Sequence, residues 1–227
     1  MTQPVSSDCR PTPTIEDYLA VMYVMDRDGE EIVAARLAES LEVSAPTVTV
    51  TLKRMERDGW IAGEGRRGVR LTEAGLEAAR SVIRRHMLTE WMLARMLHVP
   101  LSRIHDEAHA IEHSISDEIE ARMRSNLDDP HTCPHGNPLP GYEAAAAGWL
   151  PLTEALNGER GILRRIHETA EANPELMHFL EANQIFPGVQ VQVVENLAVN
   201  QTVTLAIGER QVTLGFSIAR YLFMEKN

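Results

Sequence analysis

Residues 86–113, HMLTEWMLARMLHVPLSRIHDEAHAIEH, form the stretch around which the chain is organised. His86 and Glu90 are four positions apart, so they stand one above the other on a helix. After a break at Val99-Pro100, the next helical segment carries a second polar stripe of His105, His109, Glu112 and His113. Imidazole and carboxylate groups at this spacing are ligands for a divalent transition ion such as Mn, Fe, Co or Zn. Alternatively, they are solvated polar faces.

The composition is that of a folded protein. The chain has 227 residues, 44% of them hydrophobic, enough for one large domain or two to three small ones. It has no run of roughly 18 apolar residues, and its N-terminus lacks a hydrophobic signal segment. Cys9 and Cys133 are too few for a disulfide framework. The protein is therefore expected in the cytoplasm, without a membrane partner.

The charge is distributed unevenly. The net charge of −11 by itself argues against binding nucleic acid. Between Ser44 and Arg70, however, six basic side chains accompany three acidic ones, a local excess of three positive charges. This distribution fits a DNA-binding segment attached to acidic parts, and acidic parts also suit cations.

Residues 14–58 show the pattern of a helix-turn-helix. Apolar residues recur at helical spacing after Thr14, the expected N-cap, and again in residues 32–41. A third helix is expected from Pro46 to Asp58, with Ser44 as its cap. This helix, from Pro46 to Asp58, is the second of the helix-turn-helix, and the short polar residues at its start are placed to contact DNA. The positions expected to be exposed on it are Thr47, Thr49, Val50, Thr51, Lys53 and Arg54.

A basic hairpin is predicted directly after this motif. Short strands at 60–62 and 69–72 flank a Gly/Arg-rich tip with Arg66 and Arg67. Arginine forks onto phosphate oxygens, so the tip suits contact with the DNA backbone, although a basic turn is usually only a solvated turn. Residues 1–75 are therefore predicted to form a winged helix-turn-helix DNA-binding domain.

Residues 76–141 are predicted to form a helical domain. One helix is expected from Thr72 to about Leu97 and another from Leu101 to Leu127, and the second has more apolar positions than one internal face needs. That surplus suggests a homodimer interface, although ordinary core packing explains it nearly as well. In the Pro/Gly loop that follows, 128–141, the side chains of His131, Cys133 and His135 offer metal donors, but their spacing favours an ordinary turn.

The C-terminal third changes to short strands. Residues 142–160 are predicted as a linker and 161–227 as a small SH3-like β-barrel, with strands at 161–166, 190–194, 202–207 and 211–214. Helices are expected at 174–184 and 216–223. A barrel this small is too short to hold an enzyme site of its own. The predicted fold class is mainly α with small β parts.

A winged helix, two helices with metal ligands, a Pro/Gly loop and a small barrel together resemble the diphtheria toxin repressor family of metal-dependent transcription repressors. The resemblance covers almost the whole chain and rests on APTVTVTLKRMERDGWI, RRHMLTEWML, HDEAHAIEHSISDEIEARM and HGNPLPG. It is closest to the full-length branch, which has a C-terminal FeoA-like domain. It implies a homodimer that is not an enzyme. Such a dimer binds palindromic double-stranded operator DNA when Mn²⁺ or Fe²⁺ is bound, and controls genes of metal homeostasis.

The resemblance also implies the residues of three sites. A primary metal site corresponds to Asp17, His109, Glu112 and His113. An ancillary metal site corresponds to His86, Glu90, His105, Glu168 and Glu171. The DNA-contacting set, combined with the exposed and basic positions above, is Ser44, Pro46, Thr47, Thr49, Val50, Lys53, Arg54, Arg66 and Arg67.

Several ligand positions differ from those of the family. The iron-sensing branch has Met where Asp17 stands and Cys where His109 stands, whereas the manganese-sensing branch has Asp and a carboxylate. Ala20 replaces a carboxylate that bridges two ions in short manganese sensors. Hard oxygen at Asp17, and Glu171 in place of an amide, favour Mn²⁺, with Fe²⁺ second. Zn²⁺, Co²⁺ or Cd²⁺ is expected to substitute in vitro. Val50 replaces a Gln, so a base contact there must be apolar.

Two other functions use the same features. A metalloenzyme could employ the Glu and His ligands, but no nucleophile accompanies them and the winged helix would be unexplained. A winged-helix regulator could instead respond to an organic ligand, with the His and Glu side chains merely on the surface. Only the metal-dependent repressor requires that a metal ion control DNA binding.

Overall fold

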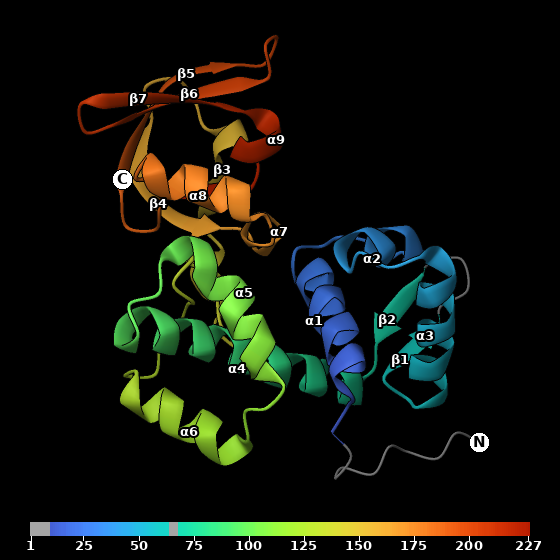
Figure 1. Cartoon of the computed structure of the whole chain (residues 1–227). Helices are drawn as coiled ribbons and strands as arrows, with labels where there is room; N and C mark the ends of the chain where they lie inside the picture. Colours follow the sequence, from blue (N-terminus) through green and yellow to red (C-terminus); the bar gives the residue numbers. More distant parts are fainter. Residues whose placement is uncertain (1–9, 64–67) are drawn as a thin grey trace. The chain divides into compact units, whose positions relative to one another are not determined.

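The structure, a computed structural model, describes residues 10–63 and 68–227. They belong to two compact units (Figure 1). The first comprises the chain up to residue 85 together with residues 112–114, and the second comprises residues 86–111 and 115–227. Among the described residues, every helix is too short or too polar to cross a bilayer.

The first unit contains the predicted helix-turn-helix and hairpin. Apolar side chains at helical spacing meet in its core, where Leu19, Leu37 and Met55 have no exposed surface. The hairpin strands pair antiparallel, with Ile61 opposite Leu71. Its elements are α1 (Pro13–Arg27), α2 (Ala34–Ser40), α3 (Ala45–Arg57), β1 (Ile61–Gly63) and β2 (Val69–Leu71), and α4 (Glu73–Met96) begins in it.

The predicted N-cap of α3, the second helix of the helix-turn-helix, is confirmed. The predicted N-cap of α1 is wrong. The hydroxyl of Ser44 accepts a hydrogen bond from the backbone N–H of Thr47 at 3.3 Å. The N-cap of α1 is Thr12 rather than Thr14, and Pro13 occupies the first turn. Proline fits there because its fixed φ is helical and the first N–H groups lack helical partners.

The single helix predicted from Leu101 to Leu127 is two helices, α5 (Leu101–Glu112) and α6 (Asp117–Asn126). The second begins because the side chain of Ser116 accepts a hydrogen bond from the N–H of Ile119 at 3.3 Å. Serine competes for backbone donors in this way and so favours a new helix start over continuation. The break leaves Glu112 and His113 at a helix end.

The C-terminal part of the second unit is built on a six-stranded antiparallel sheet in the order β3-β8-β4-β5-β6-β7. Two predictions about it were wrong. The sheet includes Trp149–Pro151, inside the predicted linker, and the chain ends in a strand rather than a helix. Alternation explains the strand, because Leu222 and Met224 are buried and Phe223 between them is not. The elements are η2 (Glu143–Ala146), β3 (Trp149–Pro151), η3 (Leu152–Glu154), β4 (Arg160–Ile166), α7 (Glu168–Glu171), α8 (Pro174–Ala182), β5 (Gln190–Leu197), β6 (Thr202–Ile207), β7 (Arg210–Gly215), α9 (Phe216–Ala219) and β8 (Leu222–Lys226).

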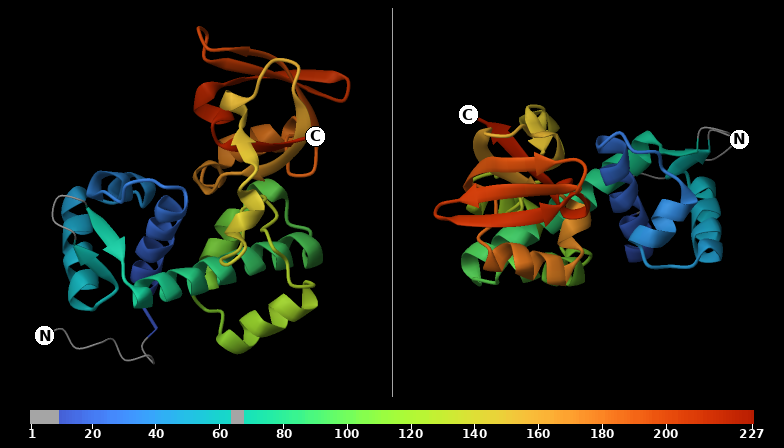
Figure 2. Two further views of the ribbon diagram at one scale, coloured as in Figure 1. Left: turned by 180° about the vertical axis from the view of Figure 1, so that it is seen from behind. Right: turned by 90° about the horizontal axis from the view of Figure 1, so that it is seen from above.

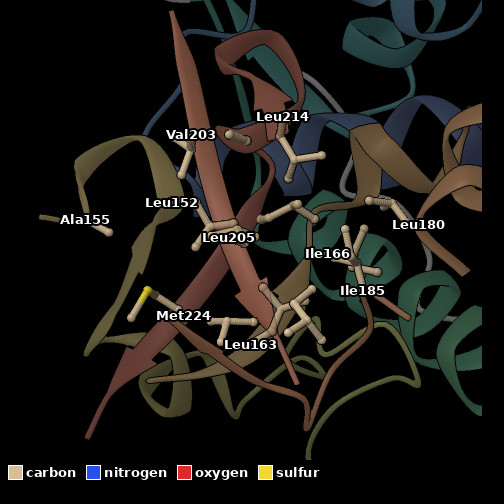
Figure 3. Packing of buried hydrophobic residues seen from close by; sticks show 14 of the residues in the cluster. Leu152, Ala155, Leu163, Ile166, Leu180, Ile185, Val203, Leu205, Leu214 and Met224 are labelled. Carbon is tan, nitrogen blue, oxygen red and sulfur yellow. The ribbon is translucent and has the colours of Figure 1, made fainter. Parts of the chain in front are cut away.

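The curved sheet encloses a core of its own. Leu163 from β4, Leu205 from β6 and Met224 from β8 have no exposed surface and point towards one another (Figure 3). Leu180 of α8 joins the same core, and further views of the domain show this helix against the sheet (Figure 2). This packing fixes the end of β4, where α7 begins.

Candidate metal centres and DNA-binding surface

Part of the predicted primary site comes together in the first unit. Nε2 of His113 lies 3.1 Å from Oδ1 of Asp17 and 3.5 Å from Oε1 of Glu112. The ligand atoms of these three side chains all lie within 4.8 Å of one another. We call Asp17, Glu112 and His113 the primary cluster. Two carboxylates and one imidazole form a hard donor set that suits Mn²⁺ or Fe²⁺.

His109, the fourth predicted primary ligand, is exposed on α5. It precedes Glu112 by three residues on this helix, so the two share a face. Its part in the site stays a prediction.

Sequence reasoning missed the side chain behind His113. Glu16 Oε2 is 2.6 Å from Nδ1 of His113, and the Glu16 side chain is only 2% exposed. The available signal was its place on α1, because Glu16 lies among the positions that helical spacing assigns to the core-facing side, between Ile15 and Leu19. A carboxylate on a buried face needs a partner, and His113 is one.

Most of the predicted ancillary site also comes together, within the second unit. α4 presents His86 and Glu90, α5 presents His105, and α7 presents Glu171. Nε2 of His86 is 3.3 Å from Glu90 Oε1, and Nδ1 of His105 is 3.2 Å from Glu171 Oε2. The ligand atoms of all four lie within 4.8 Å of one another.

His135 also belongs to this group, although the spacing of His131, Cys133 and His135 favours an ordinary turn. Its side chain is fully buried, and Nδ1 lies 3.2 Å from Glu90 Oε1 and 3.4 Å from Glu171 Oε2. Nε2 is 3.0 Å from the carbonyl oxygen of Leu101. Together, His86, Glu90, His105, His135 and Glu171 are called the ancillary cluster below. Cys133 forms a second group with Glu90 and His135.

The loop that carries His135 approaches the sheet closely. The backbone N–H of Ile166 donates to the His135 carbonyl at 2.8 Å. A Cβ on Gly136, whose φ is +89°, would lie 1.8 Å from the carbonyl oxygen of Arg164, so only glycine fits there. The HGNP sequence is thus a strap across β4 rather than a solvated turn.

Asn137 of the same loop holds Glu171. Its amide donates to Glu171 Oε1 and, at 2.7 Å, to the carbonyl of Ile166. Arg165 Nε donates to the Asn137 side-chain oxygen at 2.5 Å, while its Nη2 lies 3.0 Å from Glu168 Oε2. The predicted ligand Glu168 therefore forms an ion pair with Arg165, and its part in the ancillary site stays a prediction.

Opposing charges set the protonation of the ancillary cluster without a metal. Burial tends to lower the pKa of His135, but the charges of Glu171 and Glu90 raise it from 6.5 to about 9. Burial likewise opposes ionisation of Glu90, yet the charge of His135 and hydrogen bonds from the histidines hold its pKa well below 4.5. For Cys133, burial and the charge of Glu90 raise the pKa of the thiol well above 9.0. The cluster thus pairs the ionised carboxylate of Glu90 with the imidazolium of His135.

The ancillary cluster fits a divalent cation on one observation. Both carboxylate oxygens of Glu90 are buried, and the polar atoms that surround Oε1 are imidazole nitrogens, Nε2 of His86 at 3.3 Å and Nδ1 of His135 at 3.2 Å. A buried carboxylate needs a positive partner, and a cation shared with these imidazole nitrogens would supply one. His86, Glu90, His105 and Glu171 would hold such an ion.

The predicted DNA-contacting residues of α3 are accessible. Val50 is 70% exposed, although valine usually favours the core. The whole predicted set before the hairpin tip is exposed, namely Ser44, Pro46, Thr47, Thr49, Val50, Lys53 and Arg54. Arg66 and Arg67 lie outside the described residues, and their role stays a prediction.

Comparisons with known proteins cover both units. Residues 11–69 match the N-terminal DNA binding domain of the iron dependent repressor, residues 72–141 its metal binding and dimerisation domain, and residues 150–226 the FeoA domain. The iron-dependent repressor IdeR of Mycobacterium leprae is 34% identical over 224 residues, 94% of this chain and 97% of that one. The diphtheria toxin repressor of Corynebacterium efficiens is 41% identical over 192 residues, 80% and 83% of the two chains. A solved manganese-dependent transcriptional repressor in complex with manganese has a TM-score of 0.80 at 27% identity, covering 94% of this chain and 100% of that one.

Proposed function

The chain belongs to the iron-dependent repressor family, and we propose that it binds a palindromic operator as a homodimer when Mn²⁺, or secondarily Fe²⁺, is bound. Members of this family are metal-dependent DNA-binding repressors and not enzymes. The observation that carries the proposal is the primary cluster, in which ligand atoms of Asp17, Glu112 and His113 gather within 4.8 Å beside the winged helix.

The primary cluster would couple metal to DNA through α1. Asp17 and Glu112 bring two negative charges to one place, and these repel each other when nothing compensates them. A bound dication supplies the compensating positive charge. Asp17 would then tie α1 to Glu112 and His113, and α1 packs on α2 and β2 of the winged module. The module that carries α3 is thereby ordered for DNA. By linkage, DNA tightens metal binding as much as metal tightens DNA binding.

The ancillary cluster would add a second ion site, proposed on His86, Glu90, His105 and Glu171, with Glu168 as a further predicted ligand. His135 stands beside the same two carboxylates. We propose Mn²⁺ first because Asp17 and Glu171 are hard oxygen donors, and Fe²⁺ second because imidazole suits it.

DNA contact is proposed for the start of α3 and for the hairpin. Ser44, Pro46 and Thr47 stand at the N-terminal end of α3, where a recognition helix reads bases. Val50 would contact an apolar group such as a thymine methyl. Two half-sites, one for each subunit, are expected about one helical turn apart, ~34 Å.

The test is fluorescence anisotropy on a duplex selected from a random library in the presence of Mn²⁺. For the wild-type protein, Mn²⁺ is expected to tighten binding by about 10- to 100-fold relative to EDTA. Asp17→Ala should lose this response and remain a dimer. Asp26→Ala, an exposed carboxylate on the same helix, is the matched control and should respond like wild type. An unchanged metal response in Asp17→Ala contradicts the proposed primary site, and metal-independent binding contradicts the proposed function.

The choice of ion is tested in the same assay under anaerobic conditions. Mn²⁺ and Fe²⁺ are buffered to defined free concentrations, with Zn²⁺, Co²⁺ and Cd²⁺ for comparison. Tight binding of Zn²⁺ is expected from the Irving–Williams order and does not identify the physiological ion. Because the same order places Fe²⁺ above Mn²⁺ in affinity, the deciding readout is the extent of DNA binding at saturating ion, and the proposal requires that Mn²⁺ activate binding at least as fully as Fe²⁺ does.

A further inference from the structure

We propose that Glu16 is a positioning residue for the primary metal site, where its carboxylate orients the His113 ring so that Nε2 faces the ion. This inference rests on the proposed function, because it assumes that Asp17, Glu112 and His113 hold a metal. It concerns a residue that does not itself touch the ion.

Both ring nitrogens of His113 face carboxylates, from opposite edges of the ring. Nδ1 is 2.6 Å from Glu16 Oε2, whereas Nε2 is 3.1 Å from Asp17 Oδ1. A neutral imidazole carries its proton on one nitrogen and a lone pair on the other. A carboxylate oxygen accepts hydrogen bonds, so Glu16 Oε2 beside Nδ1 favours the tautomer that carries the proton on Nδ1. The lone pair is then on Nε2, where the other ligand atoms gather.

Glu16 is itself fixed by two arginines. Its Oε1 lies 2.7 Å from Nη2 of Arg85, and both side chains are 2% exposed. Nε of Arg10 is 3.0 Å from the same oxygen. Nη2 of Arg10 also donates to the backbone carbonyl of His113 at 3.0 Å. The two guanidinium groups hold Oε1 of Glu16, and Oε2 of the same carboxylate meets His113.

The two oxygens of the Glu16 carboxylate have different partners. Oε1 contacts the two arginines and Oε2 contacts His113. The orientation of the His113 ring therefore depends on a buried ion pair rather than on solvent. Metal-bound histidines commonly donate their second N–H to a carboxylate, and losing that partner typically weakens metal binding by 10- to 100-fold. The competing explanation is that Glu16 only neutralises the buried charge of Arg85.

Titration calorimetry with Mn²⁺ tests the proposal in a His105→Ala background, which leaves the primary site to report. Glu16→Gln keeps the size and an acceptor oxygen but loses the charge, and about 10- to 100-fold weaker binding is expected. Glu30→Gln is the matched control, because this glutamate of the same unit is exposed and pairs with Arg36. It should bind like the background protein. Wild-type affinity in Glu16→Gln overturns the proposal.

A second variant separates positioning from charge neutralisation. Glu16→Asp keeps a negative charge near the buried Arg85 but is one methylene shorter, so it should still compensate that charge while no longer reaching Nδ1 of His113, and Mn²⁺ binding should weaken. Unchanged affinity in Glu16→Asp, with loss only in a destabilised Glu16→Gln, supports neutralisation alone and overturns the proposal.

Imidazole nitrogen NMR spectroscopy of the Cd²⁺-loaded protein adds a readout that a merely structural role would not change. His113 is expected to carry its proton on Nδ1 and the metal on Nε2, and a metal on Nδ1 overturns the inference. If Asp17→Ala binds Mn²⁺ as well as wild type does, the primary site proposed above is what fails. If Asp17→Ala loses binding and Glu16→Gln does not, only the role of Glu16 fails.

Discussion

The two metal-ligand clusters use the same side-chain chemistry in opposite surroundings. In the primary cluster, Asp17 is 28% exposed and His113 18%, whereas Glu90 and His135 of the ancillary cluster have no exposed surface. Water can reach Asp17, whereas Glu90 and His135 are enclosed by protein groups, and only His86 and His105 at the edge of the ancillary cluster are partly exposed, at 13% and 25%. The ancillary cluster should therefore hold α4, α5, the HGNP loop and α7 together and stabilise the fold even without metal. The primary cluster should depend on the ion.

Removing Glu90 is expected to have the largest effect on stability. Glu90→Gln leaves His105 and His135 without one of their two carboxylate partners, and breaking a buried pair costs about 3–5 kcal/mol. Urea unfolding in EDTA measures the free energy of unfolding of the metal-free protein. Glu107→Gln on α5, whose side chain is 44% exposed, is the control and should change it by less than about 0.5 kcal/mol. Equal effects of the two substitutions would refute a structural role for the ancillary cluster.

The pH dependence of the metal-free protein is the next largest effect. Burial is outweighed by the charges of Glu171 and Glu90, which raise the pKa of His135 from 6.5 to about 9. A pKa that is higher in the folded than in the unfolded state stabilises the fold fully below the unfolded value, and this stabilisation is lost as the pH rises to the folded value. From pH 6.5 to 9 the free energy of unfolding should thus fall by an amount on the order of 3 kcal/mol.

The test of this effect is urea unfolding across that pH range in EDTA. His135→Asn should remove most of the slope, because asparagine does not titrate. A flat profile in the wild-type protein would show that His135 is not charged in the metal-free fold, and the two clusters would then differ less than their burial implies.

Helical spacing alone pairs only the cluster members that share a helix, whereas the resemblance to the family also supplied the distant members Asp17, His105 and Glu171, and neither supplied His135. His86 and Glu90 are neighbours on any α-helix, so spacing alone pairs them. His135 faces Glu90 only because its loop crosses β4, and no local pattern contains that information. The one local signal is Gly136, since glycine is the residue that permits a close backbone approach, but Gly141 of the same loop meets nothing within 4 Å, so a glycine alone does not locate the contact.

Short apolar segments explain the errors in the fold. Residues 216–223 were predicted as a helix, but they divide into α9 and the start of β8, because a few apolar residues fit either period. Pairing of β8 with β4 and β3 decides in favour of a strand, and that choice is made by tertiary contacts. The winged helix was predicted more closely because cap, turn and periodicity agree there.

The smallest expected effect on stability belongs to Asp17. In EDTA, Asp17→Asn should change the free energy of unfolding by less than about 1 kcal/mol, because a partly exposed ion pair contributes little. In Mn²⁺ the free energy of unfolding of the wild-type protein should exceed that of Asp17→Asn. An ion that binds only the folded state stabilises it by RT ln(1 + [L]/Kd), and the variant has lost a ligand. Urea titrations with and without Mn²⁺ measure both differences on one sample. A large loss in EDTA, comparable to that of Glu90→Gln, would mean that the primary cluster also stabilises the fold without metal, and the division between an ion-dependent and a structural cluster would fall.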